Sequence, residues 1–258
     1  TYKQYTSYAD FANDTTKTFN STMALMVAKY IVQAKAIGSA QELAAIPADS
    51  TASYYLTTDI DMSGVTYTAQ HFSSSFDGRG FAIKNLSGQL FNHLKEGAIV
   101  QNLALINSVR ISGQGLLAYL PYANVTINNL VVMTTGNSGQ SLAGGLFRQM
   151  TVASVTLNNV VIRTASSRNN TDHGFITGFA SSGMTVTSNN CYYIAANTVL
   201  SDGYLPIGLR SGYINSVADS KAALLGTYKQ YTTYADFVDD TTKTLTVELA
   251  SMIEKYIK

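Results

Sequence analysis

The chain has 258 residues, of which 13% are charged, and its formal net charge is +1. This charge fits neither a nucleic-acid footprint nor an electrostatic membrane anchor. No apolar run reaches the ~20 residues of a spanning helix, so we expect no nucleic-acid partner and no membrane insertion. Cys191 is the only cysteine, which excludes an internal disulfide. The three histidines lie far apart, and we expect neither a metal nor a cofactor.

The first segment of the chain returns near its end with one constant offset, which places Thr227 at the position of Thr1. Residues 1–11 return with one change as residues 227–237, and residues 14–18 are identical to residues 240–244. Lys29-Tyr30-Ile31 is repeated as residues 255–257. Chance does not produce such a match. The chain is therefore predicted to be one full period of a tandem array followed by the opening of the next period.

Each copy of this segment is predicted to form a helical connector. The expected domains are a connector at 1–36, a β-rich domain at 37–226 and the connector of the next period at 227–258. Asp14 is the expected N-cap, and apolar residues recur after it at helical spacing. Such a stripe needs a partner that covers it, so we expect it to pack on the β-rich domain or on a neighbouring period. The stripe consists of Phe19, Met23, Met26, Val27, Tyr30 and Ile31, and of Leu245, Leu249, Met252, Ile253, Tyr256 and Ile257 in the second copy.

Shorter elements follow the first connector. A helix is expected to begin at Ser39, with Glu42 completing a capping box and Pro47 just beyond its end. Residues 54–62 are predicted to form the first strand. Residues 72–88 are predicted to form the first recognisable coil, which turns at residues 77–80.

The β-rich domain is organised around residues 125–132, which alternate apolar and polar side chains, break at an Asn pair and continue apolar. Related segments lie at 83–86, 99–105, 157–162 and 187–192. Their aligned asparagines are Asn85, Asn102, Asn129, Asn159 and Asn190, and the step from one to the next lengthens along the chain. These unequal steps fit one circuit of a coil with loops of different lengths, which predicts a stacked parallel β-solenoid.

The aligned asparagines have a specific expected role at the corners of these coils. Asn tolerates the left-handed backbone conformation better than other non-glycine residues. Stacked corners let each side-chain amide bond to the Asn below and above, which satisfies polar groups that would otherwise be buried unpaired. Cys191 occupies the apolar slot that follows the Asn in the other coils, so it is predicted to be a small core residue.

Residues 59–64 and 76–86 carry a family resemblance. The stretches Asp-Ile-Asp-Met-Ser-Gly and Phe-Asp-Gly-Arg-Gly-Phe-Ala-Ile-Lys-Asn-Leu resemble the opening of GLUG-type β-helix domains of large bacterial surface proteins and adhesins. Residues 115–117 and 145–147 look like degraded forms of the short Gly-Leu motif of that family. The resemblance covers roughly residues 39–215 and implies a right-handed parallel β-helix on the cell surface, used for adhesion or display. It carries over no catalytic residue.

Polysaccharide-degrading enzymes also use right-handed β-helices, so paired acids in this chain are candidate catalytic residues. Such chemistry needs paired carboxylates with a basic residue nearby. The candidates are Asp59 and Asp61, which are two apart on the predicted strand, with Asp77 and Arg79, and separately Asp172-His173. Each also fits strand ends, turns or a solvated loop, and later coils add few acids. We expect no catalytic site.

The expected function is structural: a repeat module of an extracellular fibre or giant cell-surface protein, with neighbouring copies joined end to end through connectors that cover the tips of the rod. The alternative is an adhesin module that binds carbohydrate or a host surface. A row of exposed aromatic residues, for example Tyr119, Tyr122, Tyr192 and Tyr193, would favour it. A polysaccharide lyase or hydrolase is the third hypothesis. The expected location is extracellular, at the cell surface.

Overall fold

The computed structural model describes residues 3, 14, 16, 18, 34–110, 115–122, 124–137, 145–151, 154–163, 174–181, 184–194, 205–207 and 217–257. This part of the chain is mainly β, and its strands pair in parallel, as predicted. The helix expected in the first connector lies outside the described residues. So do six stripe residues and two candidate catalytic residues: Phe19, Met23, Met26, Val27, Tyr30, Ile31, Asp172 and His173.

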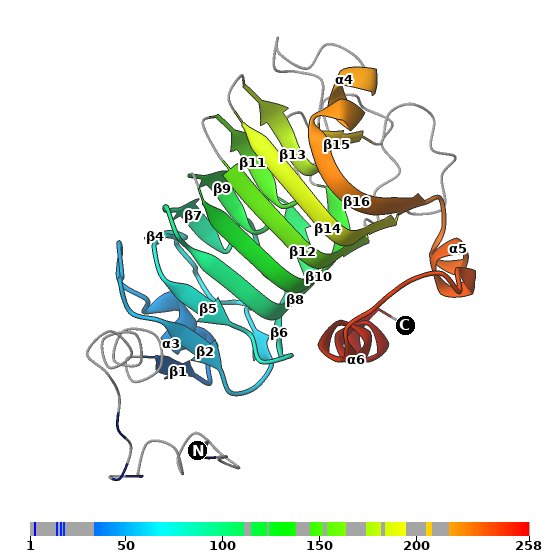
Figure 1. Cartoon of the computed structure of the whole chain (residues 1–258). Coiled ribbons are helices and arrows are strands. Elements are labelled where there is room, and N and C mark those ends of the chain that lie inside the picture. Colours follow the sequence, from blue (N-terminus) through cyan, green and yellow to red (C-terminus); the bar gives the residue numbers. More distant parts are fainter. Residues whose placement is uncertain are drawn as a thin grey trace.

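The strands form two sheets, and from β4 onward the chain passes back and forth between them (Figure 1). Among the described residues, the first sheet has ten strands: β1 (Lys35–Ile37), β2 (Tyr54–Leu56), β3 (Ile60–Asp61), β5 (Ser75–Asp77), β6 (Ala82–Lys84), β8 (Ile99–Arg110), β10 (Val125–Asn137), β12 (Ser154–Arg163), β14 (Thr185–Ile194) and β16 (Leu224–Tyr231). The second has six in the same part of the chain: β4 (Gln70–Phe72), β7 (Phe91–Leu94), β9 (Ala118–Pro121), β11 (Phe147–Met150), β13 (Gly174–Ala180) and β15 (Leu205–Ile207).

Four short helices accompany the sheets in the described part of the chain: α3 (Ala40–Ala44), α4 (Val217–Ala222), α5 (Tyr234–Asp239) and α6 (Val247–Tyr256). Helix α3 begins after Ser39, as expected, because the Ser39 hydroxyl accepts from the Glu42 backbone amide at 3.2 Å. The single strand predicted over 54–62 is instead two strands, β2 and β3. Asp59 lies between them, and its carboxylate accepts a hydrogen bond from the Ala82 amide at 3.0 Å.

The main hydrophobic core lies between the two sheets. Aromatic rings fill one part of it: Phe72 stacks on Phe91 with ring centroids 4.8 Å apart, and Phe76 meets Phe91 edge-on at 5.6 Å. The apolar residues that follow the corner asparagines continue the core along the stack, and Leu103, Leu130, Val160 and Cys191 are all fully buried there. Burial raises the pKa of the Cys191 thiol. Cys191 is therefore part of the packed interior.

The second copy of the repeated segment begins inside the ten-stranded sheet. Strand β16 includes residues 227–231 of this copy and pairs in parallel with β14, with Tyr192 opposite Lys229 and Ile194 opposite Tyr231. The domain boundary expected at 226/227 falls within this strand. The last strand of the sheet is therefore completed by residues that the repeat pattern assigns to the following period.

Candidate functional site

Helices α5 and α6 pack on the outer face of the ten-stranded sheet, opposite the core. After β16 the chain turns through α5 and runs back through α6 along the sheet (Figure 1), where α6 contacts β8 and β10. All six expected stripe residues of the second copy pack here: Leu249, Met252, Ile253 and Ile257 are buried, and Leu245 and Tyr256 are partly buried. We call the outer face of the ten-stranded sheet on which α5 and α6 pack the flank. The helical connector was expected to cover the tip of the stack, but α6 lies along the side, and only residues 227–231 of the second copy, in β16, lie at the edge of the sheet.

The flank has a shape that admits a helix. Neighbouring strands place Ala82, Ala104, Val131, Val161 and Tyr192 in one outward-facing column. The small side chains of the column lie on β6 and β8, and the large Tyr192 lies on β14. Because α6 contacts β8 and β10, it covers the end where small residues let a helix approach the sheet closely. The apolar stripe of α6 then completes a second hydrophobic cluster.

Polar contacts fix both ends of α6 to the flank. At the start, Thr246 is the N-cap, accepting from the Leu249 amide at 3.2 Å, and its hydroxyl also donates to Asn129 Oδ1 at 3.2 Å. At the end, the Tyr256 hydroxyl donates to Asp59 Oδ1 at 2.5 Å, and Arg163 donates to the Ile257 carbonyl at 2.6 Å. The apolar stripe supplies the contact area, and these hydrogen bonds fix its register on the sheet.

Asp59 is the centre of the contact at the end of α6. Its carboxylate forms ion pairs with Lys84 at 2.9 Å and Lys255 at 3.3 Å. Burial by itself would raise the pKa of Asp59, but hydrogen bonds from Tyr256, Lys84 and the Ala82 amide, with the charge of Lys255, outweigh it and lower the pKa to about 2. This value lies below that of the unfolded chain. The stabilisation that the ionised Asp59 carboxylate gives to the fold is therefore present above about pH 4 and is lost as the pH falls toward 2.

Replacing Asp59 with Asn should loosen α6 at neutral pH, because the amide cannot pair with the two lysines. We expect the free energy of unfolding to fall by about 1–2 kcal/mol and amide hydrogen exchange in α6 to accelerate, with little change in the central strands. Asp239→Asn, at an exposed carboxylate of α5, is the matched control and should stay within about 0.5 kcal/mol of the parent. Equal exchange rates in α6 for both variants would show that Asp59 does not hold the helix.

The five aligned asparagines all have left-handed backbone conformations, with φ between 49° and 58°. Two pairs of these side chains are hydrogen-bonded between levels: Asn129 Nδ2 donates to Asn102 Oδ1 and Asn190 Nδ2 donates to Asn159 Oδ1, both at 2.9 Å, while Asn129 Oδ1 accepts from Thr246. Asn102 begins this column by donating to Asp77 at 3.1 Å. Asn85 was expected in the column but lies at a different corner: Lys84 pairs with Ile106, which places Asn85 beside Asn107, and Asn85 donates to Asp61 at 2.8 Å.

A second column runs beside the first and was not predicted. The residue before each of the later corner asparagines is also Asn, and Asn158 donates to Asn128 at 2.7 Å while Asn189 donates to Asn158 at 2.8 Å. The Gln101 amide starts this column by donating to Asp77 Oδ2 at 3.1 Å. The signal in the sequence was the Asn pair itself, because two adjacent residues at stacked corners form two columns.

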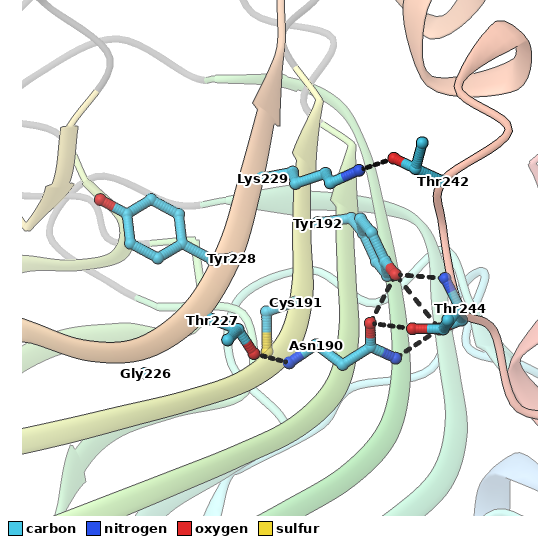
Figure 2. Close-up of a pocket in the computed structure, with 9 residues that line it drawn as sticks. All are labelled: Asn190, Cys191, Tyr192, Gly226, Thr227, Tyr228, Lys229, Thr242 and Thr244. Atoms are coloured by element: carbon cyan, nitrogen blue, oxygen red, sulfur yellow. Dashed lines mark hydrogen bonds between the residues drawn. The ribbon is translucent and has the colours of Figure 1, made fainter.

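The upper end of the first column meets the second copy of the repeated segment (Figure 2). The Thr244 hydroxyl donates to Asn190 Oδ1 at 3.0 Å, and the Thr244 amide donates to the Tyr192 hydroxyl at 3.0 Å. The Thr227 hydroxyl accepts from the Asn190 amide at 2.8 Å. These residues line a cleft between β14, β16 and residues 242–244. The hydrogen bonds across the cleft join parts of the chain and attach the segment to the last corner.

The candidate catalytic acids that the structure describes are occupied by structural contacts. Asp59 holds α6, Asp61 accepts from Asn85 and from the Ser63 amide at 2.9 Å, and Asp77 begins both columns. The Arg79 guanidinium lies over the Tyr55 ring at 3.5 Å. Within the described ranges, no group of three or more His, Cys, Asp or Glu side chains could hold a metal ion, and no helix is long and apolar enough to cross a membrane.

A row of aromatic residues lies on the six-stranded sheet, away from the core. His71 and His93 have ring centroids 4.4 Å apart, and His93 lies 6.0 Å from Tyr119 and 5.6 Å from Tyr122. Arg148 covers the Tyr119 ring at 4.5 Å. Two of the four tyrosines expected in such a row are therefore together. The other two are not: Tyr193 is fully buried in the core, and Tyr192 lies beneath the docked segment.

The two histidines of this row were not predicted as a pair, because they lie on separate strands, β4 and β7, whose pairing no local pattern marks. Nδ1 of both rings is buried and has no hydrogen-bond partner among the described residues. Burial lowers the pKa of His93, and His71 and Lys95 lower it further, while Asp49 acts in the opposite direction. Because the unfolded chain then binds the proton more readily, His93 makes the fold less stable as the pH falls below about 6.5.

His93→Gln should reduce this pH dependence, because the amide does not titrate. We expect the parent to lose stability between pH 7 and pH 5 more steeply than the variant, measured as urea midpoints at each pH with an unchanged m-value. Parallel pH profiles of the two proteins would show that His93 does not titrate in this range.

No protein-family model and no curated protein matches the chain. Among solved structures, the chain is similar to the crystal structure of a "putative immunoglobulin A1 protease" from Bacteroides ovatus, at 14% identity and a TM-score of 0.40, over 76% of this chain and 74% of that chain. This likeness carries no argument about function.

Proposed function

We propose that the chain is a right-handed parallel β-helix that serves as a structural repeat module of an extracellular fibre or giant cell-surface protein. The carrying observation is the docked second copy: a segment that repeats the opening of the chain supplies both the last strand of the sheet and the helix on its flank. The alternation between two parallel sheets and the stacked Asn corners support the β-helix.

The resemblance to GLUG-type domains of surface proteins is part of this proposal. The two Gly-Leu pairs at 115–116 and 145–146 lie on neighbouring levels of the stack, where the Leu116 amide donates to the Gly145 carbonyl at 3.3 Å. The Leu117 amide donates in the same way to the Leu146 carbonyl at 2.9 Å. A motif that recurs at one corner of successive coils is what a β-helix built from short repeats requires.

The path of α6 determines how successive modules are joined in this proposal. In the first copy, β1 begins four residues after Ile31, the counterpart of Ile257. Four residues span at most about 14 Å. Helix α6 packs on β8 and β10, and its end is held by Asp59 and by Arg163 of β12. A module stacked on β16 would begin one strand spacing beyond it, which is four to five spacings, about 19–24 Å, from β10 and β8. The first strand of a following module therefore lies beside the flank of the preceding module and not beyond its last strand. The end-to-end joining expected from the sequence would require α6 to leave the flank.

A two-period chain, in which residues 1–226 are followed by residues 1–258, tests this arrangement. Small-angle scattering and negative-stain images should show two bodies side by side, with a maximum dimension well below twice that of the single-period chain. One straight rod of double length would contradict the docked connector, and two bodies at variable separation would contradict the structural role itself. Antibody labelling of intact source cells, with permeabilised cells as the control, tests the surface location.

A carbohydrate-binding adhesin module is the second candidate, and the aromatic row on the six-stranded sheet favours it. Tyr122 is 37% exposed and lies beside His93, with Lys95 5.0 Å from its ring. Exposed aromatic rings next to cationic and hydroxyl groups suit the apolar faces of sugars. Glycan-array binding that Tyr119→Ala and Tyr122→Ala abolish, and that Tyr55→Ala on the other sheet leaves intact, would support this function. An array without bound glycans would argue against it.

A further inference from the structure

The few described residues of the first copy have the same local contacts as their counterparts in the second. Lys3 Nζ pairs with Asp14 at 2.9 Å, and the Thr16 amide and hydroxyl donate to Asp14 Oδ1 at 2.7 and 2.6 Å. In the second copy, Lys229 pairs with Asp240 at 2.7 Å, and the corresponding Thr242 distances are 2.8 and 2.6 Å. This turn network is therefore a property of the segment and not of its position in the chain.

The first copy also carries counterparts of the side chains with which the second copy holds the flank. The residue types that make the polar contacts are identical in the sequence: Thr18, Lys29 and Tyr30 correspond to Thr244, Lys255 and Tyr256. Asn20 replaces the N-cap Thr246, and Asn is an equally good N-cap. Two residues of the buried stripe are identical, Met26 to Met252 and Ile31 to Ile257, and the other two remain apolar, with Met23 and Val27 at the positions of Leu249 and Ile253.

The chain thus has two copies of the docking segment and one flank, which its own second copy covers. We propose that residues 1–33 are a docking segment for the flank of another molecule of this chain. There they replace that molecule's own residues 227–258, so that chains join head to tail. Residues 2–5 would pair with β14 as residues 228–231 do here. This inference rests on the proposed role of the segment as a connector and extends that role to contacts between separate chains.

The balance between the two segments follows from how each is attached. Residues 227–258 are tethered to the flank they occupy, which gives them an effective concentration in the millimolar range. Residues 1–33 of another molecule compete at the bulk concentration. The unmodified chain is therefore monomeric at micromolar concentration. Weakening only the contact between residues 227–258 and the flank therefore lets residues 1–33 of a neighbouring chain bind there.

The test uses the full chain with the substitutions Leu249→Asp and Met252→Asp, which place charges in the buried stripe. Sedimentation and light scattering should show the unmodified chain as a monomer. The weight-average mass of the double variant should rise at least about twofold between about 5 and 200 µM. Met23→Asp and Met26→Asp added to the double variant should restore the monomer. The same two first-copy substitutions alone should leave the chain monomeric.

Two outcomes would overturn the proposal. A Leu249→Asp/Met252→Asp chain that keeps its sheet spectrum and stays monomeric up to about 200 µM shows that the first copy does not dock. If the double variant still forms oligomers after Met23→Asp and Met26→Asp are added, the chains aggregate through the uncovered flank and not through the first copy. If the aspartates prevent folding, Met252→Ala/Ile253→Ala with Met26→Ala/Val27→Ala as the matched set gives the same comparison. If this test fails but the two modules of the two-period chain lie side by side, only docking between separate chains is disproved. If the two modules of the two-period chain lie at variable separation, the connector role of the segment is disproved as well.

Discussion

Gly145→Ala should cost about 3 kcal/mol or more of the free energy of unfolding, because a Cβ at this position has no room. It would lie 2.0 Å from the Phe175 carbonyl oxygen and 2.9 Å from its carbon, both in the backbone of the adjacent strand. The backbone cannot move away without breaking the hydrogen bond from the Gly145 amide to the Gly174 carbonyl, which is 2.9 Å long. Urea unfolding followed by circular dichroism measures the loss.

Gly64→Ala is the matched control for this substitution. Nothing lies within 4 Å of the Cβ it would gain, but its φ of +73° carries the strain of a left-handed conformation. We expect a loss of about 1 kcal/mol. Gly115→Ala should behave like Gly145→Ala, since its Cβ would lie 2.4 Å from the Leu146 carbonyl oxygen. If Gly145→Ala lowers the free energy of unfolding no more than Gly64→Ala does, the backbones of adjacent levels do not approach each other as closely as described.

Asn129→Ala should lower the free energy of unfolding by about 3 kcal/mol, because two effects add. Alanine at a φ of 49° carries about 1–2 kcal/mol of left-handed strain. The substitution also removes the hydrogen bonds to Asn102 and from Thr246, at about 1 kcal/mol each. Chemical unfolding gives the total, and hydrogen exchange in α6 reports the lost contact with Thr246.

Two further substitutions separate the strain from the column. Asn129→Gly keeps the left-handed backbone and loses only the side chain, so it should recover about 1 kcal/mol relative to Asn129→Ala. Asn124→Ala is the control outside the column. Asn124 has a φ of 60° in an exposed turn and donates to Glu96 at 3.1 Å. A cost at Asn124 equal to that at Asn129 would mean that stacking adds nothing to the stability of a corner.

The parallel sheets and the positions of the corners could be predicted because local chemistry determines them. Asn is the ordinary residue that accepts a left-handed φ at low cost, so its recurrence before an apolar residue marks a corner wherever that corner lies in space. The stripe from Leu249 to Ile257 was predictable for a similar reason, since its period fixes which face is buried. Both signals are contained within a few residues.

The features that were missed depend on distant parts of the chain. The repeat pattern places a boundary after Gly226, but pairing with β14 decides where the last strand ends. The helix of the second copy begins after Thr246 and not after the counterpart of Asp14, because Asp240 bonds to Thr242 in a turn. The strand over 54–62 divides because Asp59 turns toward Ala82 and α6. No local period encodes such contacts.

The hydrogen bonds of the Asn columns all point the same way, and this has a consequence for how such a chain can change in length. The bonds run toward the first strands, and both columns end on the carboxylate of Asp77, which accepts from Asn102 and Gln101. Each bond between two asparagines joins an amide nitrogen to the amide oxygen of the level below, so these rungs are alike. A whole rung can therefore be gained or lost in the middle while the carboxylate foot and the threonine-capped head keep their partners. Such a ladder tolerates variation in its height but not in its two ends.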